Sequence, residues 1–141
     1  MKAVVSRVAH AQVAVEGQVV GQIDRGLLVY VGVIAGDGPD QAAWLADKLL
    51  ALRIFPDDEG KMNRSVVDVA GGLLLISNFT LAGRTKKGTR PSFTDAAPPE
   101  LAQPLFDAVV ERCAQRVPAA TGEFGAHMMI DSTADGPVTI L

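Results

Sequence analysis

The chain has 141 residues, 48% of them hydrophobic, which is enough for the core of one domain and leaves little room for a second. We therefore expect a single domain over residues 1–141. Thirteen Lys and Arg residues against sixteen Asp and Glu residues give a net charge of −3, which excludes strong attraction of the whole molecule to a polyanion, so any contact with nucleic acid must be local.

The first third of the chain has the pattern of β-strands. Residues 2–8 and 11–23 contain β-branched residues with partial alternation, and Glu16-Gly17 lies where a hairpin turn would reverse the chain. Residues 26–34 are a continuous apolar run, which is typical of a strand buried on both faces. We therefore expect an opening meander followed by a central strand.

The middle of the chain predicts a helix, a loop and a second buried strand. Apolar residues recur at helical spacing from Pro39 to Leu52, which predicts a helix over these residues. Residues 55–63 have the composition of a loop. Residues 71–81 begin as an apolar run and end in polar residues, so they predict a buried strand whose last residues reach the surface.

The last third predicts an exposed loop, a second helix and two closing strands. Residues 83–93 contain too many Gly, Thr and basic residues for a regular element. A helix is predicted from Pro98 to Arg116, and strands over residues 126–132 and 136–141. Because two helices cannot cover both faces of a large sheet, the predicted fold is mixed α/β, with layered, partly barrel-like mixed sheets.

Histidine and cysteine predict neither a metal centre nor a disulfide. His10 and His127 are the only histidines and lack the spacing of metal ligands, so we expect no metal and no other cofactor. Cys113 lies in the second predicted helix, where the role of a small buried residue is favoured over that of a nucleophile. The lone cysteine and the interrupted apolar pattern near Arg7 predict a cytoplasmic protein without membrane contact.

Polar residues with potential chemistry gather where the second buried strand ends. Ser77, Asn78, Phe79 and Thr80 bring two hydroxyls, an amide and an aromatic ring to one place. A strand end whose polar groups only satisfy one another is the structural alternative. Thr80 is a potential nucleophile, although the sequence places no base beside it.

A basic run follows this strand end directly. Arg84, Lys86, Lys87 and Arg90 would form a solvated loop if considered alone. Next to a strand end that carries an aromatic ring, the same loop becomes a plausible cradle for a terminal nucleotide and its phosphates. Near the end of the chain, Asp135-Gly136-Pro137 has the composition of a simple turn.

Several motifs together resemble those of the D-aminoacyl-tRNA deacylases, and the resemblance covers essentially the whole chain. They are, in chain order, RIFPDDEGKMN at residues 53–63, SNFTLAG at 77–83, RPSF at 90–93, VERC at 110–113 and DGPVT at 135–139. Two positions depart from the pattern. The family usually has Gln at the position of Asn78 and Asn at that of Ala134, so affinity or rate could differ.

The resemblance implies a homodimer whose active sites are shared between subunits. The Gly136-Pro137 peptide would be cis and inserted into the partner's active site, where its carbonyls form a wall beside the substrate's α-carbon. An L side chain would collide with this wall and a D side chain would point away. Glycine has no side chain to reject, so glycyl-tRNA mischarged on tRNA(Ala) is also an expected substrate. Arg7 would brace the turn through its carbonyls.

The resemblance also implies that the tRNA assists its own deacylation. The aminoacyl ester is activated, and the 2′-hydroxyl of the terminal adenosine lies within reach of its carbonyl, so positioning supplies much of the catalysis. Ser77, Asn78 and the Phe79 backbone would orient the ester. The Phe79 ring would lie near the adenine, and Thr80 would position the substrate without attacking it.

Two other functions fit parts of the sequence. A non-catalytic nucleic-acid-binding module would use the basic loop and Phe79, and it would retain D- and L-charged tRNA equally. A small deaminase acting on free metabolites would need no tRNA at all.

Overall fold

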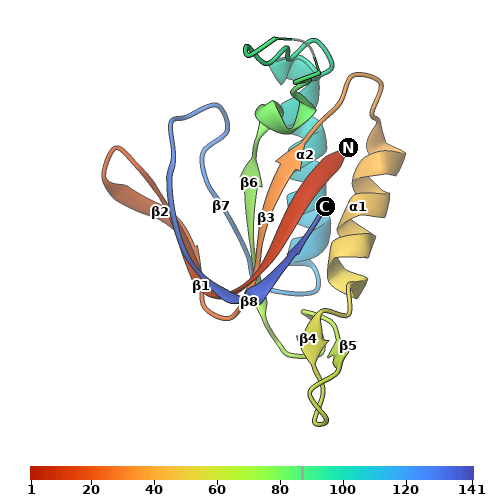
Figure 1. The fold of residues 1–141 in the computed structure, drawn as a ribbon, viewed down its shortest axis with the longest axis vertical. Coiled ribbons are helices and arrows are strands. Elements are labelled where there is room, and N and C mark those ends of the chain that lie inside the picture. Colours follow the sequence, from red (N-terminus) through yellow and green to blue (C-terminus); the bar gives the residue numbers. More distant parts are fainter. Residues whose placement is uncertain (87) are drawn as a thin grey trace.

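The computed structural model of the chain describes residues 1–86 and 88–141. In chain order its elements are β1 (Lys2–Val15), β2 (Gln18–Ile23), β3 (Gly26–Gly32), α1 (Pro39–Ala51), β4 (Phe55–Pro56), β5 (Met62–Arg64), β6 (Gly72–Ser77), the 3-10 helix η1 (Phe79–Ala82), α2 (Pro99–Ala114), β7 (Ala119–Thr121) and β8 (Met129–Ile140). Both helices lie on one side of the main sheet, whereas β1, β2 and β8 curl away on the other side (Figure 1).

The main sheet curls until its two ends meet. Its strands lie in the order β2-β1-β3-β6-β7, and β8 also pairs with β1. A Cβ added to Gly21 in β2 would lie 2.3 Å from the carbonyl oxygen of Thr121 in β7. Only glycine tolerates this approach, so Gly21 allows the two ends of the sheet to come together. The predicted class, mixed α/β with two helices and a nearly closed, barrel-like sheet, is confirmed.

The central strand β3 is buried on both faces, as its apolar run predicts. Leu27, Val29 and Val31 pack in the core that α1 and α2 cover. Leu28 points the other way, into a second core inside the curled sheet. Successive side chains of a strand alternate between its faces, so one apolar run supplies both cores.

Residues 55–63, predicted as a loop, instead contain most of a short hairpin formed by β4 and β5. The Asp57 carboxylate accepts hydrogen bonds from the backbone N–H groups of Glu59 and Lys61, both at 2.9 Å, and from Nδ2 of Asn63 at 2.7 Å. These bonds close the turn between two strands of two and three residues. Such short strands carry no periodicity that a sequence could reveal.

The second predicted strand, residues 71–81, ends earlier than expected. β6 stops at Ser77, and η1 follows because the Asn78 side chain accepts a hydrogen bond from the Thr80 N–H and caps the helix. The three-residue strand β7 has no predicted counterpart. It forms by parallel pairing with β6, which is a long-range contact.

The two predicted closing strands are one strand, β8, which contains a bulge. Val8 pairs with Ala134, and the next register pair joins Ser6 to Thr139. Residues 135–138 therefore stand opposite a single residue of β1. Local turn composition predicts a break at this point, whereas continued pairing with β1 keeps both halves in one strand.

Other predictions are confirmed closely. Glu16 and Gly17 have φ angles of 50° and 78° and form the turn between β1 and β2. α1 and α2 begin and end within two residues of their predicted bounds, and Cys113 is buried in α2. In the described part of the chain, none of the helices combines the length and the apolar character needed to cross a bilayer.

Candidate active site

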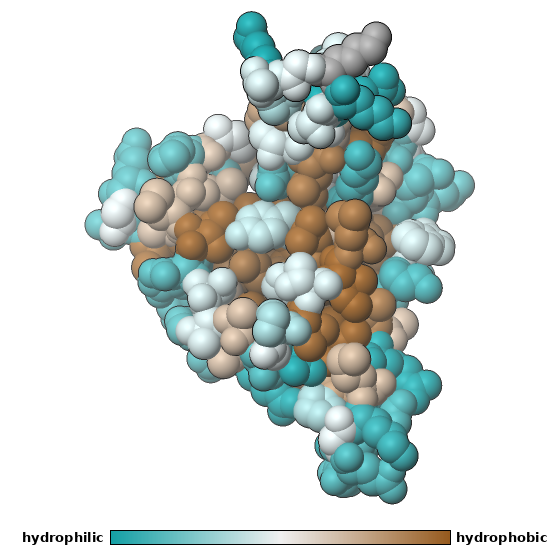
Figure 2. All heavy atoms as spheres, viewed as in Figure 1, coloured by the Kyte–Doolittle hydropathy of each residue, from teal (hydrophilic) through white to brown (hydrophobic). Residues whose placement is uncertain are grey.

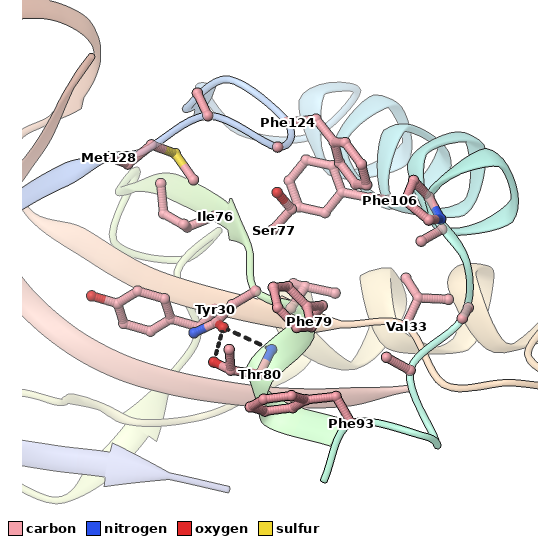
Figure 3. Close-up of a pocket in the computed structure, with 18 of the residues that line it drawn as sticks. Tyr30, Val33, Ile76, Ser77, Phe79, Thr80, Phe93, Phe106, Phe124 and Met128 are labelled. Carbon is pink, nitrogen blue, oxygen red and sulfur yellow. Dashed lines mark hydrogen bonds between the residues drawn. The ribbon is translucent and has the colours of Figure 1, made fainter. Parts of the chain in front are cut away.

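A cavity of about 740 Å³ opens at the carboxyl ends of the parallel strands β3 and β6 (Figure 3). The segments that follow β3, β6 and β7 all contribute to its lining, together with the start of α2. Parallel strands end at the same edge of a sheet, and the segments leaving them diverge there and create a crevice. The fold thus places the predicted Ser77–Thr80 site in a cavity.

The turn after β6 is organised by one side chain. Oδ1 of Asn78 accepts hydrogen bonds from the Thr80 backbone N–H at 3.2 Å and from the Thr80 hydroxyl. An amide oxygen is not a base, so the Thr80 hydroxyl has no proton acceptor that would activate it as a nucleophile. The arrangement suits a hydroxyl that positions a substrate.

Gly32 at the end of β3 allows this turn to lie close to the sheet. A Cβ added there would stand 2.9 Å from Cβ of Leu81 and 3.0 Å from the Asn78 carbonyl oxygen. The Asn78 N–H donates to the Val31 carbonyl at 2.8 Å, which ties the turn to β3. The Phe79 N–H, by contrast, has no acceptor within the described residues and is available to a substrate.

Aromatic rings line two parts of the cavity. Phe79 and Phe93 meet edge to face with their centroids 5.2 Å apart, and 59% of Phe79 is exposed. Phe106 and Phe124 form a second pair, 6.4 Å apart, at the α2 side. Figure 3 shows both pairs turned toward the cavity, so it offers apolar surfaces to a flat base and polar groups near Ser77.

The described residues of the basic loop precede Phe93 in sequence and include three exposed basic side chains. Arg84 is paired with the Asp95 carboxylate, which partly neutralises its charge. Lys86 and Arg90 are exposed to solvent. Lys87, the fourth basic residue of the predicted tRNA-binding group, lies outside the described residues.

Gly136 and Pro137 are not brought to this cavity within the chain. Their peptide bond is cis, and they lie in the bulge of β8, whereas the cavity lining ends at Ile130. Arg7 holds the base of the bulge: its Nε donates to the Asp135 carbonyl at 3.0 Å. The contacted carbonyl belongs to the residue that precedes Gly136.

Arg7 has a second partner outside the bulge. Its Nη1 donates to the carbonyl of Ile54 at 2.7 Å, next to the β4–β5 hairpin, and its Nε also lies 3.1 Å from the Asp135 carboxylate. The side chain is only 11% exposed. Arg7 therefore connects two segments that are far apart in sequence, which is a more specific role than that of a surface arginine.

The family model described as D-Tyr-tRNA(Tyr) deacylase matches residues 4–141. The chain belongs to this family. A D-aminoacyl-tRNA deacylase of Opitutus terrae is 57% identical over 143 residues, covering 100% of this chain and 95% of the relative. One from Pseudomonas aeruginosa is 54% identical over 142 residues, covering 100% and 98%. The family predicted from the motifs is confirmed, and with it the enzyme class, a deacylase and thus a hydrolase.

Two solved structures resemble this deacylase-family fold. A structure titled "c-Myc DNA Unwinding Element Binding Protein" has a TM-score of 0.94 and 37% identity, covering 99% of this chain and 96% of that one. A probable eukaryotic D-amino acid tRNA deacylase has a TM-score of 0.83, covering 98% and 96%. At 16% identity, this second likeness concerns the fold alone.

Several cavity residues were not among the predicted site residues of this deacylase-family chain. Phe106, Phe124, Met128 and His127 line the cavity only because α2 and the segment after β7 fold beside the end of β6. Their local sequence carries no signal of this. Tyr30 is different, because it is the one residue with a polar tip in the apolar run of β3.

Two further kinds of group in the described residues are potential metal ligands and the cysteine thiol. Across residues 1–86 and 88–141, no three His, Cys, Asp or Glu side chains lie close enough together to hold a metal ion. Burial raises the pKa of the Cys113 thiol to about 11, so it stays protonated and unreactive at neutral pH.

Proposed function

We propose that the protein hydrolyses the ester between a D-amino acid and the 3′-terminal adenosine of tRNA, and leaves the L-aminoacyl ester intact. The observation that carries the proposal is the cavity at the ends of β3 and β6, where the polar groups of Ser77, Asn78 and Thr80 meet aromatic rings. An aminoacylated adenosine has the same combination, a flat base and a polar ester. Action on charged tRNA also places the protein in the cytoplasm.

We propose that the 2′-hydroxyl of the substrate's own terminal adenosine assists the hydrolysis. The Phe79 N–H has no acceptor in the described part of the chain, so it is available to polarise the ester carbonyl. The proton of the Thr80 hydroxyl is engaged with Asn78, which leaves that oxygen as an acceptor for the substrate. The protein would supply orientation, and the vicinal hydroxyl would help to activate the water that attacks the ester carbonyl, so that the D-amino acid is released and the 3′-hydroxyl of the adenosine takes up the proton.

The chirality filter proposed is the Gly136-Pro137 bulge of a second subunit. In a homodimer with an isologous interface, each chain would insert its bulge into the other's cavity. The separation of bulge and cavity within one chain supports this. The bulge carbonyls would exclude L side chains and admit D side chains. Glycine has no side chain to exclude, so glycyl-tRNA mischarged on tRNA(Ala) is a proposed substrate.

Two further features support self-association. In the described chain β8 pairs only with β1, so its other edge has free backbone groups. Figure 2 shows apolar side chains gathered in the middle of one face, with polar side chains at its upper end and over the β4–β5 hairpin at its lower end. Apolar surface of this kind is common at protein interfaces.

The basic loop is the proposed contact for the tRNA backbone. Lys86 and Arg90 are exposed in the loop that precedes Phe93, and Lys87 adjoins them in sequence. Phosphate contacts position a substrate and carry no stereochemical information. Neutralising these residues should therefore weaken tRNA binding and its dependence on salt without changing the preference for D over L.

The decisive experiment follows ester loss from D-Tyr-tRNA, L-Tyr-tRNA and Gly-tRNA. We expect rapid loss from the first and the third and none above background from the second. A D-Tyr-tRNA ending in 2′-deoxyadenosine should be nearly inert. Free D-tyrosine serves as a control, since ammonia release from it would indicate a deaminase instead.

The shared site is tested by mixing two inactive variants. Gly136→Ala alters the bulge, and Thr80→Trp fills the cavity. Random exchange between the two dimers would restore about a quarter of the wild-type sites, because half the dimers are mixed and each has one intact cavity facing one intact bulge. No recovery after proven subunit exchange would contradict the shared site.

A second function is favoured by one observation. The related structure with 37% identity has a title that describes a DNA-binding protein. A protein that only binds nucleic acid would retain D- and L-charged tRNA equally and hydrolyse neither. The same deacylation assay therefore separates the two functions.

A further inference from the structure

Tyr30 is the polar exception in the most apolar strand of the protein. The other six residues of β3 are buried, and Tyr30 alone is partly exposed. It lines the cavity together with the residues of the Ser77–Thr80 turn. A leucine or valine would continue the pattern of this strand, so the phenol calls for an explanation other than core packing.

The alternation of β3 directs Tyr30 away from the helices. It lies on the same face as Leu28 and packs against the core inside the curled sheet. Its neighbour across the parallel pairing is Ile76 on β6. Figure 3 shows the ring extending away from Thr80, at the end of the cavity where Ile76 and Met128 also lie. Tyr30 thus forms a wall of the cavity distinct from the Ser77–Thr80 turn.

The hydroxyl of Tyr30 is available to a ligand. Within residues 1–86 and 88–141, no buried side-chain polar atom lacks a hydrogen-bond partner. The Tyr30 hydroxyl makes no bond to these residues, so it is reached by solvent and is not sealed in the core, and the side chain that carries it lines the cavity. Burial of the side chain raises the pKa of Tyr30, so the phenol stays neutral and can both donate and accept a hydrogen bond.

The part of the substrate that the Tyr30 hydroxyl contacts is inferred from the part that all substrates have in common. The family relatives are named for D-aminoacyl-tRNA in general, without one amino acid. A fixed hydrogen-bonding group that served a single side chain would penalise the others. The terminal adenosine is the same in every charged tRNA, and it has polar atoms on both base and ribose.

We propose that Tyr30 is a substrate-positioning residue whose hydroxyl binds the terminal adenosine of tRNA. This inference rests on the proposed function for its substrate. It adds a contact from β3, at a distance from the Ser77–Thr80 turn, so that the adenosine is held from the side of β3 while the ester lies at that turn. A group that binds the constant part equally in ground and transition states lowers KM without changing kcat.

The test compares Tyr30→Phe with the wild type in two measurements. The first is the dissociation constant of adenosine 5′-monophosphate, titrated by NMR, which requires no catalysis. The second is the steady-state kinetics with D-Tyr-tRNA and D-Ala-tRNA. We expect the dissociation constant and both KM values to rise about five- to tenfold, as for the loss of one hydrogen bond, with kcat unchanged.

Two controls isolate the hydroxyl. Ser6→Ala removes a hydroxyl that faces Thr139 between β1 and β8, outside the cavity lining, and should leave all constants unchanged. Tyr30→Leu removes the ring as well and should weaken nucleotide binding further. The thermal midpoint of Tyr30→Phe should equal or exceed that of the wild type, because no intramolecular bond is lost.

Two results would overturn the inference. One is unchanged nucleotide binding and KM in Tyr30→Phe. The other is a change in KM for D-Tyr-tRNA alone with unchanged nucleotide binding, which would place the hydroxyl at the amino acid. If the wild type hydrolyses no D-aminoacyl-tRNA, the proposed function fails, but weaker nucleotide binding by Tyr30→Phe still supports the adenosine contact.

Discussion

The turn at Ser77–Thr80 and the bulge at residues 135–138 are two irregular segments that carry family motifs, and they are built in opposite ways. The turn closes on itself, since Asn78 caps η1 and holds Thr80. It also lines a cavity formed by its own chain. The bulge is tied at its start by Arg7 and packs Val138 against the core, but none of its residues belongs to that lining.

In the proposed function, this difference separates binding from selection. The cavity has its polar and aromatic groups in place within one chain, so it would hold the aminoacylated adenosine. The bulge lies outside the lining of this cavity and would act on the cavity of a second subunit. In the proposed dimer, changes to the bulge should therefore alter rate and chirality, whereas changes to the turn should alter binding and orientation.

The largest effect is expected from Gly136→Ala. Gly136 has a φ of 140°, and an added Cβ would lie 2.6 Å from the Val138 nitrogen, so the bulge must change shape. Deacylation of D-Tyr-tRNA should fall on the order of 100-fold, as for a misplaced group at a reacting centre. Nucleotide binding to the cavity should not change.

The matched control for this variant is Gly60→Ala. Gly60 also has a positive φ, 80°, but lies in the β4–β5 hairpin with nothing within 4 Å of the added Cβ. Gly60→Ala also places a non-glycine residue at a positive φ, but it lies outside both segments and creates no clash. Equal loss of activity in the two variants would mean that the bulge acts only through stability.

A smaller effect is expected from Arg7→Met. This change removes two hydrogen bonds from a nearly buried guanidinium, at 2.7 and 3.0 Å, and leaves the Ile54 and Asp135 carbonyls without their donor. The free energy of unfolding should fall by about 2–3 kcal/mol, and deacylation by about tenfold. Urea unfolding and the tRNA assay measure the two effects.

Arg112→Met provides the comparison for Arg7→Met. Arg112 forms an exposed ion pair with Asp47, at 2.6 and 2.8 Å, between the two helices. Exposed pairs contribute about 0–1 kcal/mol, so little change in stability and none in activity is expected. If Arg112→Met lost as much stability as Arg7→Met, Arg7 would contribute no more to the fold than an exposed arginine does.

Thr80→Val should have a modest effect on deacylation. The change removes a hydroxyl that donates a hydrogen bond to the Asn78 amide oxygen, and the Thr80 backbone N–H still donates to the same oxygen. We expect a loss of less than about tenfold in kcat/KM. A loss of about 10⁴-fold or more, the size seen when a true nucleophile is removed, would assign that role to Thr80.

The smallest effect is expected from Asp57→Asn, in the hairpin that Arg7 connects to the bulge. Hydrogen bonds from the Asn63 side chain and from the Lys61 and Glu59 N–H groups lower the pKa of Asp57. A carboxyl with a lowered pKa stabilises the fold above its unfolded pKa, and this stabilisation is lost as the pH falls below about 4.

When the pH falls from about 5 to about 3, the variant should therefore lose less stability than the wild type. The midpoints of denaturant unfolding, measured at several pH values in this range, check this. Activity near neutral pH should be unchanged. A change in D-over-L preference in Asp57→Asn would mean that the hairpin acts on the bulge through Arg7.

The sequence by itself determined the elements whose signal is local and repeated. The helical spacing from Pro39 placed α1, and the apolar run from Gly26 placed β3, because a side chain's face follows from its position along a helix or strand. The family motifs, including SNFTLAG at residues 77–83, identified the family and directed attention to the strand end.

Only the tertiary structure decided the features that depend on distant partners. β7 exists through pairing with β6, and the bulge at residues 135–138 through register with β1. Tyr30 became a cavity residue because the segments after β6 and β7 leave a space beside its face of β3. Pairing and register are set by contacts across the fold, so no local pattern in these residues encodes them.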